Sequence, residues 1–157
     1  MIPETIQVGS EQATVLATSK ETNGDLFAVE LRVPPGGGPP VMHSHLPSEI
    51  YRVLAGEFTF YSTGSDGITT RRIARPGDTV TIPGNTPHTV RNESTEDAVA
   101  LQVHAPGGAI EGFARAAAQL AVEHEPTIEE VFAIAERHGI ELLGPVPHIG
   151  SSAMSGE

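Results

Sequence analysis

Two histidines and a glutamate lie close together in the segment HSHLPSE, residues 43–49. In an extended strand, side chains at positions i and i+2 point to the same side, so His43 and His45 share a face. Glu49 has the same parity, although Pro47 is expected to bend the chain before it. Two imidazoles and a carboxylate that converge on one point are a ligand set typical of a transition-metal site.

A third histidine is a candidate to complete this set. His88 follows the turn PGNTP and begins an expected strand, and Val90 and Asn92 lie on the same face of that strand. A single buried histidine is more often a core residue whose hydrogen bonds are satisfied than a metal ligand. His88 is therefore a ligand candidate only in combination with His43, His45 and Glu49. If its strand packs beside the first one, the site has three nitrogens and one oxygen.

Short strands separated by turns are the elements that must hold these side chains, from about residue 12 to residue 105. FAVELRV (27–33) alternates apolar and charged residues, which is the pattern of a half-buried antiparallel strand. Further strands are expected at 49–55, 57–62, 68–74, 78–83, 88–92 and 98–104. Many short strands with Gly, Pro, Asn and Asp between them predict a sandwich or a small antiparallel β-barrel.

Beyond this region the pattern changes to helices. Residues 111–122 are rich in alanine, and the segment 126–139 has a capping box formed by Thr127 and Glu130, with Gly139 as its stop. Neither helix could bury enough surface alone, so we expect both to pack outside the β-structure.

Three parts are therefore expected along the chain: a β-barrel over 1–110, a helical extension of the same domain over 111–148, and a flexible tail over 149–157.

Length and composition limit the class of protein. The 157 residues suffice for one domain, and the net charge of -11 makes nucleic acid or an anionic membrane surface an unfavourable partner. The absence of cysteine excludes disulfides and thiolate chemistry. The first residues lack the pattern of a signal peptide, and no apolar run approaches the roughly 20 residues that span a bilayer. We expect a cytoplasmic protein.

The spacing of the candidate ligands resembles that of the cupins. The first cupin motif, a glycine, His-x-His, a glutamate and a second glycine, is matched by Gly37, His43, His45, Glu49 and Gly56. The second motif is matched by Gly77, Pro83, His88 and Asn92. Asn85 replaces a glycine of that motif, and asparagine also tolerates a left-handed backbone. The resemblance covers residues 12–105 and implies a jelly-roll barrel with one divalent metal held by His43, His45, Glu49 and His88.

Within the cupins, the chain is similar to single-domain proteins related to quercetin 2,3-dioxygenase. The similar segments are PPVMHSHLPSEIYRVLAGEFTF and RPGDTVTIPGNTPHTVRN. This resemblance implies a metal-dependent dioxygenase that acts with dioxygen on a flavonol-like, phenolic or enolisable small molecule, with Glu49 as ligand and general base. Two alternatives remain open: a non-catalytic metal-binding cupin that binds or senses a small molecule, and a non-oxidative metal-dependent isomerase, cyclase or decarboxylase.

The sequence specifies the identity of the metal and the residues that line the pocket less well than it specifies the ligands. Imidazole and carboxylate ligands suit Fe, Mn, Co, Ni, Cu or Zn. Parity makes Tyr51, Val53, Ile82, Val90 and Asn92 candidates for the substrate pocket, with His104 at its mouth, whereas Phe58 and Phe60 are better explained as core. An exposed strand edge also favours pairing between copies of the chain, so we expect a homodimer.

Overall fold

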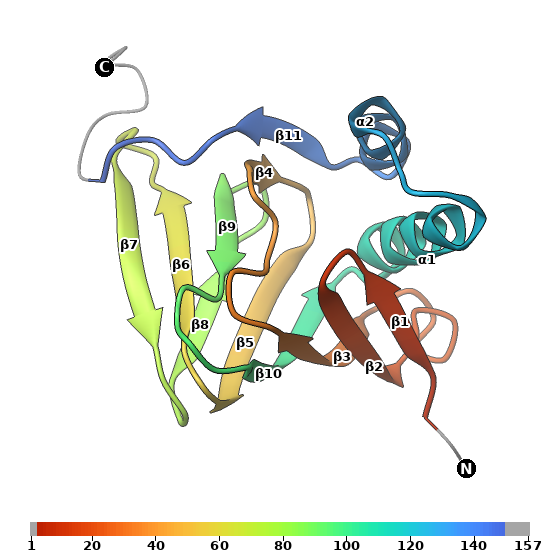
Figure 1. Ribbon diagram of the computed structural model, residues 1–157, viewed down its shortest axis with the longest axis horizontal. Helices are drawn as coiled ribbons and strands as arrows, with labels where there is room; N and C mark the ends of the chain where they lie inside the picture. Colours follow the sequence, from red (N-terminus) through yellow and green to blue (C-terminus); the bar gives the residue numbers. More distant parts are fainter. Residues whose placement is uncertain (1–2, 150–157) are drawn as a thin grey trace.

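Two antiparallel sheets face each other in this structure, and two helices lie at one side of them, α1 beside β1 and α2 between α1 and β11 (Figure 1). The structure is a computed structural model that describes residues 3–149. Residues 150–157, most of the predicted tail, therefore lie outside the described residues. No helix within 3–149 is both long enough and apolar enough to cross a membrane.

The first sheet has six strands in the order β1-β2-β3-β10-β5-β8. Their bounds are β1 (Thr5–Val8), β2 (Glu11–Ala17), β3 (Phe27–Val33), β5 (Ser48–Ala55), β8 (Thr79–Ile82) and β10 (Ala98–Ala105). The predicted strand FAVELRV is β3, and its phenylalanine, valines and leucine are all buried while its charged residues are exposed. This alternation turns one face of the first sheet toward the second.

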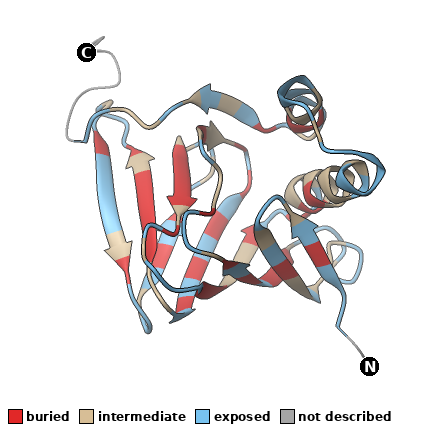
Figure 2. Ribbon diagram, viewed as in Figure 1, coloured by how far each residue is buried: buried red, intermediate tan, exposed pale blue. Residues whose placement is uncertain are grey.

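The second sheet has five strands in the order β11-β4-β9-β6-β7. Their bounds are β4 (Met42–Ser44), β6 (Phe58–Thr63), β7 (Thr69–Ala74), β9 (His88–Arg91) and β11 (Glu141–Gly144). β6 and β9 in its middle are almost wholly buried, whereas β7 at its edge is mostly exposed (Figure 2). The expected antiparallel jelly-roll fold is confirmed, and its strands form two separate sheets that are not joined into one closed barrel.

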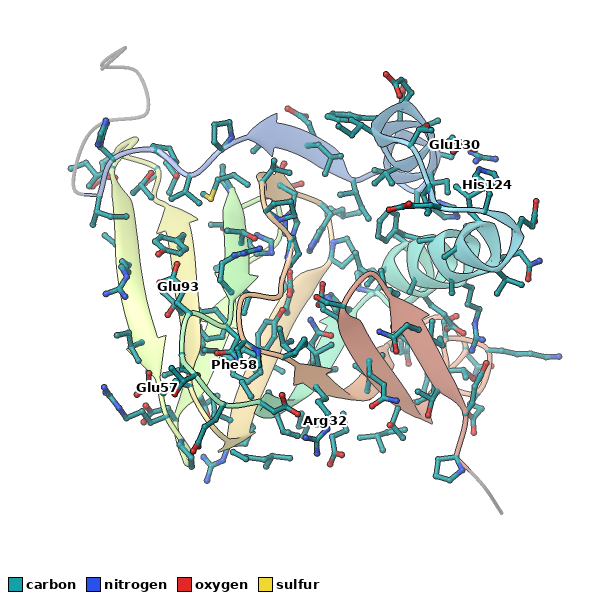
Figure 3. All side chains as sticks on the ribbon, viewed as in Figure 1. Arg32, Glu57, Phe58, Glu93, His124 and Glu130 are labelled. Atoms are coloured by element: carbon teal, nitrogen blue, oxygen red, sulfur yellow. The ribbon has the colours of Figure 1, made fainter. Side chains whose placement is uncertain are left out.

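The core lies between the two sheets. Phe58 has no exposed surface, and its ring centroid lies 6.3 Å from that of Phe60 and 6.3 Å from that of Tyr51 (Figure 3). Val53, Ile82 and Val90 belong to the same buried cluster. The prediction that Phe58 and Phe60 are core residues is confirmed.

The C-terminal segment forms the two expected helices, α1 (Gly108–Glu123) and α2 (Ile128–Arg137). The capping box of Thr127 and Glu130 is present, and Gly139 has a φ of +72°, which glycine adopts without steric cost. The Nε2 atom of His124, at the end of α1, lies 2.9 Å from Oε2 of Glu130 in α2, and this contact connects the two helices (Figure 3).

β2 and β4 lie inside the region assigned to strands but had no predicted range of their own, and two further strands lie outside that region. β1 precedes the region assigned to strands, and β11 lies inside the segment assigned to helices. Both are four residues long, which is too short for a clear alternation. They exist through pairing: β1 pairs with β2, and β11 pairs with β4.

Candidate metal centre

Three neighbouring strands bring the four predicted ligands together. His43 lies in β4 and His88 opens β9, and these two residues are direct partners across the strand pair. His45 follows β4 immediately, and Glu49 is the second residue of β5. One ligand atom of each of these four residues lies within 4.8 Å of the others. The histidine and glutamate spacing seen in the sequence therefore corresponds to one cluster in space.

The turn before His88 braces the loop that carries the other ligands. The backbone N–H of Asn85 donates to the carbonyl oxygen of His45 at 2.7 Å, and the N–H of Gly84 donates to Ser48 Oγ at 2.9 Å. A Cβ atom at Gly84 would lie 2.1 Å from the carbonyl oxygen of Leu46, so no side chain fits there. Asn85 has a φ of +64°, which confirms the left-handed backbone expected at this position.

The backbone fixes the orientation of the three histidine rings. Each ring has its Nδ1 near a carbonyl oxygen two residues away: His43 at 3.3 Å from Val41, His45 at 2.9 Å from Pro47, and His88 at 2.7 Å from Thr86. A carbonyl oxygen can only accept, so Nδ1 carries the proton in these contacts and Nε2 is left for a metal. The Nε2 atoms of His45 and His88 lie 2.9 and 2.5 Å from Glu49 Oε2.

The lowered pKa values of Glu49 and His43 favour their deprotonated forms, which are the forms that bind a cation. Burial by itself would raise the pKa of the Glu49 carboxyl, but the charge of His104 and hydrogen bonds from His104, His45 and His88 hold that pKa well below its ordinary value. Burial, helped by the charge of His88, lowers the pKa of His43 to about 4, so its ring is neutral at neutral pH. Burial is the largest single influence on His88 and opposes its charged form, but the hydrogen bond to Glu49, the charge of Glu49 and the backbone contact with Thr86 together outweigh burial and raise the pKa of His88.

A buried carboxylate among imidazoles is balanced by a proton on a ring or by a metal ion. Metal ligands must be deprotonated, so a divalent cation competes with that proton for the same atoms. His45, Glu49 and His88 are buried, while His43 is only half-buried. Of the four groups, His43 thus marks the side from which the cluster can be reached.

Two further predicted residues contact the cluster. Tyr51 donates its hydroxyl proton to Glu49 Oε1 at 2.9 Å, and the Nε2 atom of His104 lies 3.3 Å from the same oxygen. His104 was expected at the mouth of a pocket, but its side chain is buried beside the carboxylate. Gln102, which the sequence analysis did not select, donates to the Tyr51 hydroxyl at 2.6 Å. Its signal was available, because Gln102 has the parity of His104 on an otherwise apolar strand.

The remaining pocket candidates are buried, and Ile82 is the cross-strand partner of Glu49. Val53, Ile82 and Val90 pack in the core cluster. The Asn92 side chain is fully occupied in a turn: it donates to the carbonyl oxygens of Val33 and Glu96 and accepts from Ser94. Asn92 therefore organises the chain after β9 and is not one of the four clustered groups.

Besides Glu49, the acidic side chain of Glu11 also faces the interior, and it was not predicted from the sequence. It opens β2 with the parity of the buried Ala13 and is itself half-buried. Burial raises the pKa of its carboxyl to about 7; Arg91 opposes this shift and the charge of Glu49 adds to it. Its charge also contributes to the raised pKa of Tyr51, behind burial and the charge of Glu49.

Comparison with known proteins agrees with this architecture. Residues 29–104 match the family model described as "Cupin domain". No curated protein matches the chain. Among solved structures, a variant of Bacillus subtilis oxalate decarboxylase superimposes with a TM-score of 0.58 at 21% identity, over 68% of this chain and 28% of that one. The chain thus spans little more than a quarter of that protein.

Two shorter proteins are similar over most of their length. A predicted oxalate decarboxylase from Thermotoga maritima gives a TM-score of 0.56 at 21% identity, over 67% of this chain and 92% of that one. An RmlC-like cupin from Shewanella frigidimarina gives 0.54 at 21% identity, over 68% of this chain and 86% of that one. At this identity the similarity establishes a shared fold and leaves the reaction open.

Proposed function

Because residues 29–104 form a cupin domain whose interior gathers three histidines and one glutamate, we propose that the protein is a metal-dependent dioxygenase of the quercetinase-like type. Its substrate would be a flavonol-like, phenolic or enolisable small molecule. The metal-dependent part rests on the convergence of four ligand atoms within 4.8 Å of one another. In addition, the Nδ1 atom of each of the three clustered histidines, His43, His45 and His88, lies next to a backbone carbonyl oxygen.

The residues of the site divide the work between binding and proton transfer. His43, His45, His88 and Glu49 would hold one divalent transition metal. When bound, the metal supplies a Lewis acid that makes a substrate hydroxyl more acidic. Glu49, the carboxylate among the four clustered groups, would accept the proton, and a strong base is not required. The half-buried His43 leaves an approach for the substrate from its side.

A second candidate is a non-oxidative decarboxylase. It is favoured by the structural similarity to oxalate decarboxylase, a protein in which Mn(II) centres have been described. The same four ligands suit Mn as well as Fe, Co, Ni, Cu or Zn, so the ligand set supports both reactions equally. The third candidate is a non-catalytic metal-binding protein, which the same experiment distinguishes from the two enzymes.

Oxygen uptake by the reconstituted protein tests the proposal. The metal-free protein would be loaded separately with Fe(II), Mn(II), Co(II), Ni(II) and Cu(II) and offered flavonols, catechols and diketones. A parallel set would receive oxalate, with carbon dioxide release as the readout. The control is the double variant His43→Ala/His88→Ala, and Glu49→Gln tests the base.

Each outcome selects one reading. Metal-dependent oxygen uptake that the double variant abolishes supports the dioxygenase and identifies its metal. Carbon dioxide release without oxygen uptake selects the decarboxylase, and bound metal without either reaction selects a binding protein. Full activity in Glu49→Gln would show that Glu49 is not the base, and failure of every metal to bind would refute the metal-dependent function itself.

A further inference from the structure

We propose that Tyr51 and His104 are positioning residues that hold the Glu49 carboxylate so that a single oxygen, Oε2, faces the metal. The inference rests on the proposed function, because it describes how one ligand is presented in the metal-bound protein. It assigns a role to two residues outside the ligand set, and it accounts for contacts that metal binding alone does not require.

The two oxygens of Glu49 have different partners. Oε2 lies 2.5 Å from His88 Nε2 and 2.9 Å from His45 Nε2, so it belongs to the ligand cluster. Oε1 accepts a hydrogen bond from Tyr51 at 2.9 Å and lies 3.3 Å from His104 Nε2. Oε2 thus faces the ligand cluster, whereas Oε1 contacts Tyr51 and His104.

These contacts are built into one pair of strands. His104 is the cross-strand partner of Glu49, and Gln102 is the cross-strand partner of Tyr51, both between β10 and β5. The four side chains have the same parity and point into the interior as two adjacent rows. Gln102 donates to the Tyr51 hydroxyl at 2.6 Å, so the tyrosine is itself oriented before it reaches Glu49.

Packing leaves these groups little freedom to move. Tyr51 and His104 are each only 3% exposed. The Tyr51 ring lies edge-on to Phe60, with ring centroids 5.0 Å apart. A carboxylate that is hydrogen-bonded through Oε1 to such a partner cannot turn both oxygens toward a metal without losing those bonds.

The other nitrogen of His104 points to the same role. Its Nδ1 is buried and is the one buried side-chain nitrogen or oxygen within residues 3–149 that has no hydrogen-bond partner. Buried polar atoms are almost always paired, and an unpaired one reduces stability. A histidine that served packing alone would be better replaced by an apolar residue, so its contact with Glu49 is the feature that explains its presence.

Presenting one oxygen has a consequence for the metal. A carboxylate that binds through both oxygens fills two coordination positions, whereas Glu49 held at Oε1 would fill one. The position left open would then be available to a substrate oxygen. Residues that orient a ligand in this way typically change metal affinity by about 10- to 100-fold when they are removed.

The two tyrosines of the chain provide a matched test. Tyr51 and Tyr61 each donate a hydroxyl proton to a glutamate, but the partner of Tyr61 is Glu93, which is not one of the clustered ligands. Metal-free wild type, Tyr51→Phe and Tyr61→Phe would be titrated with Co(II) against a chromophoric chelator. The visible absorption spectrum of bound Co(II) would be recorded in each case, since its intensity reports the coordination number.

We expect Tyr51→Phe to bind Co(II) about tenfold more weakly, with weaker visible absorption as Glu49 turns its second oxygen to the metal. Tyr61→Phe should match the wild type in both measurements. His104→Phe should resemble Tyr51→Phe, while His104→Gln keeps an N–H donor and should recover the wild-type spectrum. That recovery would exclude a merely structural role. If Tyr51→Phe fails to fold, Gln102→Leu, which removes the support of Tyr51, should show the same spectral change in a smaller degree.

Two failures are distinguishable. If the wild type binds Co(II) and both Tyr51→Phe and His104→Phe retain its affinity and spectrum, the positioning role is wrong while the metal site stands. If the wild type binds no metal, the proposed function fails and the inference fails with it.

Discussion

The half-buried carboxyl of Glu11 makes the stability of the protein dependent on pH in a way that one substitution can isolate. Glu11 faces the interior from β2, and no hydrogen bond or ion pair of its carboxyl group is present within residues 3–149. Burial raises its pKa from the ordinary 4.5 to about 7. The folded state therefore holds this proton more tightly than the unfolded chain does.

The sign of the effect follows from proton linkage. Below about pH 4.5 the carboxyl is protonated in both states, and the folded state has its full stability. As the pH rises from about 4.5 to about 7, the unfolded chain loses the proton first and the free energy of unfolding decreases. A shift of about 2.5 pKa units corresponds to about 3 kcal/mol, and this is an upper value because the side chain retains some contact with water.

Glu11→Gln replaces the protonated carboxyl with a group of similar shape that does not titrate. Urea unfolding of the metal-free variant and the wild type would be compared between about pH 5 and about pH 8. We expect similar stability at the acidic end and a variant that is more stable by about 1–3 kcal/mol at the alkaline end. The metal is removed because a bound cation nearby would lower the pKa of Glu11.

Glu30→Gln is the control, since Glu30 is exposed on the outer face of the adjacent strand β3. The difference between this variant and the wild type should stay small and constant across the same pH range. If the Glu11→Gln and wild-type curves also run parallel from the acidic to the alkaline end, the carboxyl does not carry a raised pKa. The interior position assigned to Glu11 would then be wrong.

Three further predictions concern packing and the turn beside the ligands. Phe58→Ala should lower the free energy of unfolding by about 3–5 kcal/mol in urea denaturation, because the ring has no exposed surface and leaves a cavity in the core; a loss below about 1 kcal/mol would contradict that packing. Gly84→Ala should weaken Co(II) binding more than it lowers the melting temperature, since its Cβ would lie 2.1 Å from the Leu46 carbonyl oxygen between two ligands; unchanged affinity would show that the turn does not brace the site. Asn85→Gly should be neutral within about 0.5 kcal/mol and Asn85→Ala should cost about 1 kcal/mol, because asparagine and glycine tolerate the φ of +64° and alanine does not; equal melting temperatures would contradict the left-handed backbone.

Local patterns were sufficient to predict the parts of the fold that depend on local chemistry. The alternation of FAVELRV predicted the bounds and the buried face of β3. The capping box of Thr127 and Glu130 predicted where α2 begins. The spacing of the histidines and Glu49 identified the four clustered groups, because two of them sit on adjacent strands and the loop between β4 and β5 is short.

Contacts between distant segments could not be predicted from such patterns. Four residues of β11 carry no periodic signal, and the strand forms because β4 offers an unpaired edge. Gln102 and His104 look like isolated polar residues on an apolar strand until the register with β5 places them beside Tyr51 and Glu49. The division of the strands into two separate sheets was unpredictable for a related reason, since it depends on how the sheets meet and not on any single strand.

The attachment of β4 also bears on how the protein is made. β4 pairs with β9 at the single position of His43 and His88, but it pairs with β11 at three positions. The strand that carries His43, the first candidate ligand, is thus secured mainly by residues 141–144, which leave the ribosome after both helices. We expect a nascent or truncated chain that lacks β11 to hold His43 loosely and to retain metal poorly. Metal binding at the candidate site would then follow the synthesis of β11, so that partly synthesised molecules without this strand would not sequester the ion.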